Sequence, residues 1–142
     1  MAVRSNFEPE WAVTAVHAFR ALLWAAVALH GAVFLVAFVL DLARRRVPGW
    51  LWAVYLAAST LVVLQGLSGV ALSLSGTRPP DPLHFLYGLL SLGGALAAFG
   101  LRPGGFLRGA VLPVREARAV ALLSLTVAAL LLRAYQTGLF AR

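Results

Sequence analysis

Long apolar segments separated by short polar breaks dominate the pattern of this chain. A helix needs about 20 mostly apolar residues to cross a bilayer. Four segments reach that length: residues 16–40, 50–74, 83–101 and 119–140. We therefore predict an all-α integral membrane protein, with four transmembrane helices in a single domain that covers the whole chain.

Arginines in the breaks predict the orientation of these helices. The first break holds three arginines at positions 44–46, and the third holds four within residues 102–118. The second holds only Arg78, close to Asp81. Because short cytoplasmic loops are enriched in basic residues, the first and third breaks are expected inside and both termini outside. The expected fold is an up-down-up-down four-helix transmembrane bundle.

Composition supports a membrane protein and narrows its partners. The chain is 61% hydrophobic and 12% charged, and its mean hydropathy is +0.87. A net charge of +7 is explained by cytoplasmic loops, so the expected partner is the lipid bilayer and not nucleic acid. We expect a multi-pass protein of a bacterial inner (plasma) membrane. The absence of cysteine from the sequence excludes disulfides, thiolate metal sites and cysteine nucleophiles.

Acidic residues are placed where they give little support to transport or catalysis. No carboxylate lies within a predicted span, because Asp41 falls at the end of the first and Asp81 in a connection. Proton relays and ion pumps usually need a buried acid, so a small transporter is the least favoured function. The sequence contains none of the common metalloprotease, phosphate-loop or nucleophile-elbow motifs. An independent catalytic activity is therefore not expected.

His84 has the most informative setting of the three histidines. Asp81 is a favourable N-cap and Pro82 suits the first helical position, which places His84 in the first turn of the third helix. The helix dipole disfavours imidazolium there, and neutral imidazole is the form that binds metals. The following residues on its face, Gly88 and Ser91, are small. The alternative is a histidine that only completes the capping turn.

His17 and His30 are weaker candidates on the first helix. His30 lies deep in the span, where an ionisable side chain is a functional hypothesis by default. Its alternative is a neutral histidine hydrogen-bonded to a neighbouring helix. His17 lies near the outer interface, where a solvated histidine is ordinary.

A faint internal repeat links His17 to His84. The segment "HAFRALLWAAVAL" from His17 aligns with "HFLYGLLSLGGAL" from His84, including the histidines and several apolar residues. A tandem repeat of two-helix units would place these histidines opposite each other near the outer surface. Apolar helices also give leucine matches by chance, so the repeat remains an alternative and not a certainty.

Two histidines on facing helices with small neighbours suggest a b-type haem with two axial histidines. The candidate iron ligands are His84 and His17, with His30 as the alternative to His17, although His84 without a partner also stays open. Helix rise predicts a depth mismatch of about 13 Å for His17 and about 6 Å, in the opposite sense, for His30. The basic residues that could bind the haem propionates are Arg20, Arg78 and Arg133.

A polar-to-small stripe on the fourth helix includes the last of these arginines. A charge within a span is costly unless it is paired or reaches the interface. We therefore expect the stripe to face the bundle or a partner subunit. Its members are Thr126, Ala129, Arg133, Gln136 and Thr137.

The segment "LQGLSGVALSLSGTRPPDPLHFLYGLL", Leu64 to Leu90, resembles one half of a haem A synthase. In that family a helix with a Gln-x-x-x-Gly pattern precedes an outer loop and a histidine that opens the next helix. The matching residues here are Gln65, Gly69 and His84. The resemblance implies a haem-ligating role for His84. With four spans and no counterpart of the family's catalytic carboxylate, only the haem-binding architecture carries over. Small bundles of the cytochrome b561 type are similar at the same level.

Two functions from different classes follow. The first is a b-type haem-binding electron-transfer subunit of a respiratory membrane complex. The second is a cofactor-free accessory subunit of a respiratory or other membrane complex. In it, Arg133 and two stripes of small residues would be docking surfaces. The stripes are Ser59, Gly66 and Ser73 on the second helix and Gly88, Ser91 and Ala95 on the third.

Overall fold

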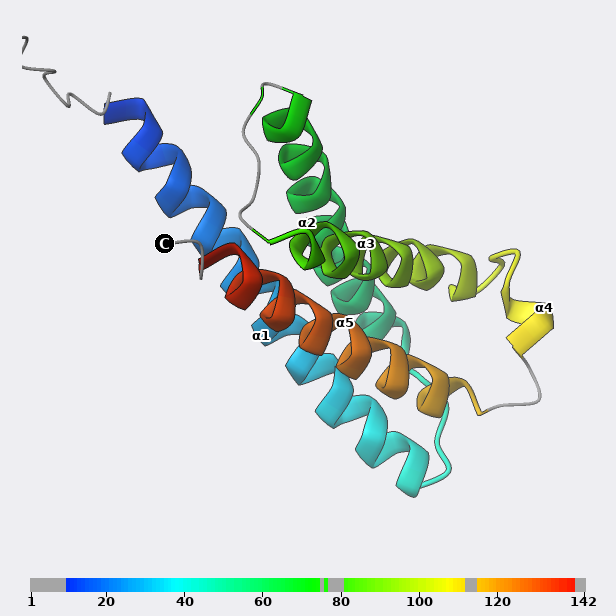
Figure 1. Cartoon of the computed structure of the whole chain (residues 1–142). Coiled ribbons are helices and arrows are strands. Elements are labelled where there is room, and N and C mark those ends of the chain that lie inside the picture. Colours follow the sequence, from blue (N-terminus) through cyan, green and yellow to red (C-terminus); the bar gives the residue numbers. More distant parts are fainter. Residues whose placement is uncertain (1–9, 75, 77–80, 112–114, 140–142) are drawn as a thin grey trace, which may run out of the picture.

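The computed structural model describes residues 10–74, 76, 81–111 and 115–139, with no account of side chains at 10–19, 110–111 and 139. Every regular element in this part of the chain is a helix (Figure 1). The helices are α1 (Glu10–Leu42), α2 (Gly49–Leu74), α3 (Leu83–Leu101), α4 (Arg108–Val111) and α5 (Glu116–Leu139).

The four long helices are each long and apolar enough to cross a membrane, as the sequence predicts. The observed bounds of α2 and α3 agree with the predicted ones to within one residue. Helix α1 begins six residues before its predicted start, and α5 begins at Glu116, three residues early. An acidic residue in the first turn favours that earlier start of α5 because it faces the positive end of the helix dipole. The short helix α4 was not predicted.

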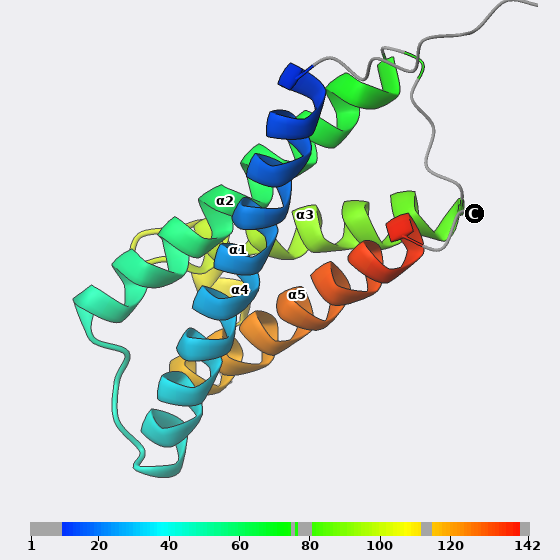
Figure 2. The ribbon, with the colours of Figure 1, turned by 90° about the vertical axis from the view of Figure 1, so that its left-hand side faces the viewer.

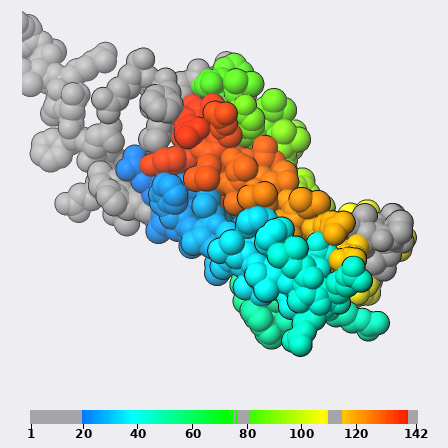
Figure 3. Space-filling model, turned by 90° about the horizontal axis from the view of Figure 1, so that it is seen from below, coloured from blue at the N-terminus to red at the C-terminus, as the bar shows by residue number. Residues whose placement is uncertain are grey.

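The long helices form a ring in which each contacts its neighbours in sequence. Helix α2 packs against α1 and α3, and α5 packs against α3 and α1, which closes the ring. Figure 3 shows α5, in orange, running alongside α1, in blue and cyan. The arrangement places α1 and α3 diagonally across the bundle and confirms the predicted four-helix bundle.

The core consists of two apolar clusters stacked along the bundle. One includes Val33, Leu51, Ala98 and Val120, and the other includes Ala26, Val62, Ala95 and Val127. Each cluster draws residues from all four long helices. Small residues bring the helices close, as is usual in membrane bundles.

The first and third connections meet at one end of the bundle, which we call the arginine end (residues 41–48, 102–111 and 115–118). The backbone N–H of Val47 donates to the Glu116 carboxylate at 3.4 Å, and Asp41 pairs with Arg118 at 3.0 Å.

Helix α1 ends at the arginine end with Arg44 in the left-handed region (φ 54°). The Arg45 N–H donates to the Leu40 carbonyl at 2.8 Å. This is the Schellman arrangement that usually uses glycine.

The bundle opens toward the opposite end, which we call the histidine end because α3 begins there at Leu83, next to His84. The last buried residue of α2 is Val62 and the first of α3 is Ser91. The two helices approach where Gly66 faces the Leu92 side chain, and they diverge beyond it (Figures 1 and 2). Apolar faces of both helices therefore remain uncovered by the rest of the bundle.

Candidate functional site

A capping turn fixes His84 at the start of α3. The Asp81 carboxylate accepts a hydrogen bond from the Leu83 N–H at 2.9 Å. Pro82 already has helical dihedral angles (φ −56°, ψ −28°), so its missing N–H costs no helical bond. The His84 N–H donates to the Asp81 carbonyl at 3.0 Å. The cap is the one expected from the sequence, and it holds the His84 backbone in the first turn.

The His84 ring is oriented by the last turns of α5. Its Nδ1 lies 2.8 Å from the Ala134 carbonyl oxygen. A carbonyl oxygen can only accept, so Nδ1 carries a hydrogen, and in the neutral form of the ring the free lone pair belongs to Nε2. The ring rests on Gly138, where an added Cβ would lie 3.1 Å from Nδ1 and Cε1. Metal-binding histidines commonly donate their second nitrogen to a backbone carbonyl in this way.

Small residues leave space beside the uncovered faces of α2 and α3. A Cβ added at Gly88, one turn after His84, would meet no atom within 4 Å. The same holds for Gly69 on α2. The predicted small face after His84 therefore borders open space along its first turn, whereas Ser91 lies buried in the bundle.

His30 lies in a different environment, enclosed in the core. It is 0% exposed, and its ring packs edge-to-face on Tyr55 with 5.8 Å between ring centroids. Neither ring nitrogen makes a hydrogen bond with another described protein atom. The expected alternative, a hydrogen bond from His30 to a neighbouring helix, is therefore absent from the described part of the chain.

His30 belongs to a layer of buried polar side chains between the two apolar clusters. The layer, which we call the polar layer, comprises His30, Tyr55, Ser59 and Ser124, all 0% exposed. The Tyr55 and Ser124 hydroxyls approach each other without the geometry of a formed hydrogen bond. Sequence reasoning did not predict this layer; the four-residue spacing of Tyr55 and Ser59 was the available signal.

His30 and His84 are not brought together. The Trp24 and Tyr135 rings meet edge-to-face at 5.5 Å, beside the Ala134 carbonyl that binds His84. His30 lies six residues beyond Trp24 along α1, which is about 9 Å deeper by helix rise. His30 is also fully enclosed in the core, whereas the open space lies beside His84 along Gly88 and Gly69, so its enclosure disfavours the pair.

The structure describes the side chains of only some of the remaining predicted residues. His17 is part of α1, but its side chain lies outside the described residues, as does Arg78. Arg20 and Arg133 are exposed. Thr126, Ala129 and Gln136 are exposed as well, so the stripe on α5 points away from the bundle. The expectation that the stripe faces the bundle is wrong, because α5 packs on α1 and α3 through other faces. The other expectation, that the stripe faces a partner subunit, stays a prediction.

Comparisons with known proteins provide no relative for this chain. No family model matches it, and neither the curated proteins nor the solved structures contain a match.

Proposed function

We propose that the chain is a b-type haem-binding electron-transfer subunit, in which His84 would bind the iron. The observation that carries this proposal is the 2.8 Å contact between His84 Nδ1 and the Ala134 carbonyl. That contact fixes the tautomer in which Nε2 is free to bind iron. The adjacent open faces of α2 and α3 are apolar, which suits a flat, largely hydrophobic ligand.

His17 would be the second histidine that binds the iron. Helices α1 and α3 lie diagonally across the ring, so residues on them face each other across the bundle. His17 lies seven residues before Trp24, about 10 Å further out along α1 by helix rise. Tilt of α1 and the length of the two side chains must compensate for this offset. Arg20, one turn from His17, is exposed at the same end and suits a propionate.

Haem would supply one-electron redox chemistry, and the chain would supply ligands and a low-dielectric surrounding. His84 would hold the iron, and the leucines and phenylalanine of the first α3 turns would exclude water. A chain with short connections needs partners to receive and deliver electrons, so we propose a place in a respiratory complex of a bacterial inner membrane.

An absorbance spectrum tests this proposal directly. The chain is expressed with haem available and purified in mild detergent, and the Soret band is measured against protein concentration. We expect His84→Ala and His17→Ala each to remove or strongly weaken the band, while His30→Ala, also a histidine of α1, retains it. A wild-type protein that folds by circular dichroism but has no Soret band contradicts the proposal.

A cofactor-free accessory subunit is the second candidate, and the exposed stripe on α5 favours it. Arg133 is exposed within a membrane-spanning helix and makes no ion pair with another described residue. A partner subunit that pairs with this charge would lower its cost in the membrane. This function predicts co-purification with larger membrane subunits that is lost in Arg133→Leu and retained in His84→Ala. Retention of the partner in Arg133→Leu contradicts it.

A further inference from the structure

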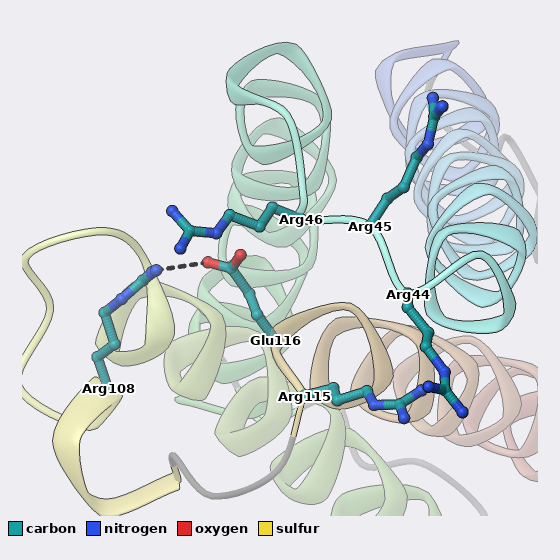
Figure 4. A pocket seen from close by; sticks show the side chains of 6 residues that line it. All are labelled: Arg44, Arg45, Arg46, Arg108, Arg115 and Glu116. Atoms are coloured by element: carbon teal, nitrogen blue, oxygen red, sulfur yellow. Dashed lines mark ion pairs between the residues drawn. The ribbon is translucent and has the colours of Figure 1, made fainter.

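A hollow at the arginine end gathers positive charge from three parts of the chain. It has a volume of about 470 Å³ (Figure 4). The α1–α2 connection, α4 and the start of α5 all contribute to its wall. The lining residues are Arg44, Arg45, Arg46, Arg108, Arg115 and Glu116.

Glu116, the single acid of this lining, is already engaged in holding the wall together. Its carboxylate pairs with Arg108 at 2.7 Å and accepts the Val47 N–H at 3.4 Å. These contacts tie α4 and the first connection to α5. Glu116 therefore fixes the shape of the hollow, and little of its charge remains to neutralise the other arginines.

Three consecutive arginines at the hollow are unpaired within the described part of the chain. Arg44, Arg45 and Arg46 make no ion pair with the described residues, whereas Arg115 shares Asp41 with Arg118. In Figure 4 the Arg46 side chain extends toward the Arg108–Glu116 pair. One terminal nitrogen of Arg108, Nη1, is buried at the hollow and has no hydrogen-bond partner in the described structure.

Arg44 adopts a backbone conformation that is unfavourable for a residue with a side chain. Arg44 has φ 54°, a region in which a side chain crowds the backbone and glycine is usual. The chain nevertheless has arginine at this position, at the wall of the hollow. Residues held in such a conformation often serve a binding function.

We propose that this hollow binds a phosphate group. Guanidinium groups bind phosphate oxygens in a bidentate manner, and several arginines that line one hollow provide such donors. A volume of about 470 Å³ suits a phosphate with its substituent. Two sources share this chemistry: the head group of an anionic phospholipid, because basic pockets at helix ends in membranes bind such groups, and free phosphate in the adjacent water.

Two matched variants test the site. Arg46→Gln removes a lining charge, and Arg102→Gln removes an exposed charge at the same end that does not line the hollow.

In the lipid arm, purified protein receives equal amounts of phosphatidylglycerol and phosphatidylcholine with identical chains, and native mass spectrometry gives the bound ratio. In the soluble arm, inorganic phosphate is added to protein in phosphatidylcholine nanodiscs, and the melting temperature is followed.

We expect Arg46→Gln to weaken phosphate binding roughly tenfold, the effect of one charge-assisted hydrogen bond, and Arg102→Gln to leave it unchanged. Selectivity for phosphatidylglycerol with this pattern identifies a lipid head group. A melting-temperature increase with this pattern identifies free phosphate. If both variants weaken binding equally, phosphate is attracted to the basic face in general, and the proposal is overturned. An absence of binding in both arms also overturns it. If Arg46→Gln fails to fold, Arg45→Gln takes its place.

Discussion

The His84 imidazole donates its Nδ1 hydrogen to the Ala134 carbonyl oxygen, 2.8 Å away on α5. This bond joins the first turn of α3 to the last turns of α5 and determines which ring nitrogen stays free. It is also the one polar contact that the structure describes between these two helices at the histidine end. The geometry of any ligand on His84 therefore depends on the fit between two helices.

Gly138 controls that fit. A Cβ in Gly138→Ala would lie 3.1 Å from the His84 ring, so the ring must shift and its bond to Ala134 must lengthen. We expect the free energy of unfolding, measured by SDS titration in mixed micelles, to fall by about 1 kcal/mol. Gly31→Ala, at a position with no atom within 4 Å, is the control and should not destabilise. Equal stability of Gly138→Ala and the wild type would show that the ring relaxes freely.

His30 illustrates the opposite case, a buried histidine whose ring makes no hydrogen bond with the described residues. His30→Leu removes two unpaired ring nitrogens and keeps a side chain of similar size in the core. We expect the free energy of unfolding to stay constant or to rise by about 1 kcal/mol, because the desolvation cost of the nitrogens exceeds the ring contact with Tyr55. The same SDS titration measures it.

Val33→Ala, at an equally buried position one turn away, is the control for this substitution and should lower stability. A large loss of stability in His30→Leu would show that the ring nitrogens bind a group within the core. The Soret band of haem-loaded protein should be unaffected by His30→Leu, which separates this result from the proposed function.

Two adjacent glycines of α3 test the packing of the bundle. A Cβ at Gly94 would lie 2.6 Å from Val127 on α5, whereas a Cβ at Gly93 would meet no atom within 4 Å. We expect Gly94→Ala to lower the free energy of unfolding by about 1–3 kcal/mol through overpacking. Gly93→Ala should raise it slightly, because alanine is the better helix former. The same stability for both variants would contradict the described contact between α3 and α5.

The sequence predicts this fold well where a cap or breaker marks each helix end. Helix α3 begins and ends as predicted because Asp81 and Pro82 start it and Pro103 follows its end. The short helix α4 depends instead on tertiary contacts: Leu107 packs on Gly100, and Arg108 pairs with Glu116. No local pattern in the sequence indicates those contacts.

The candidate sites also differ in how much of each could be predicted from the sequence. The cap places His84 in a known turn, so its position could be predicted, but its bond to Ala134, fifty residues away, could not. The polar layer joins residues from three helices, each ordinary in its own segment. The arginines of the first and third connections predict topology, whereas their positions around one hollow depend on how Glu116 ties the connections together.

Arg44→Gly separates stability from binding at the arginine end. Glycine adopts φ 54° without a Cβ clash, so we expect the free energy of unfolding to rise by about 1 kcal/mol in SDS titration. The same variant removes a lining charge, so its selectivity for phosphatidylglycerol over phosphatidylcholine, or its response to phosphate, should fall. Arg45→Gly is the matched control, because it also removes a lining charge but at a position without a positive φ. In this variant both the free energy of unfolding and the phosphate or phosphatidylglycerol response should fall. A loss of stability in Arg44→Gly would instead show that its guanidinium supports the fold.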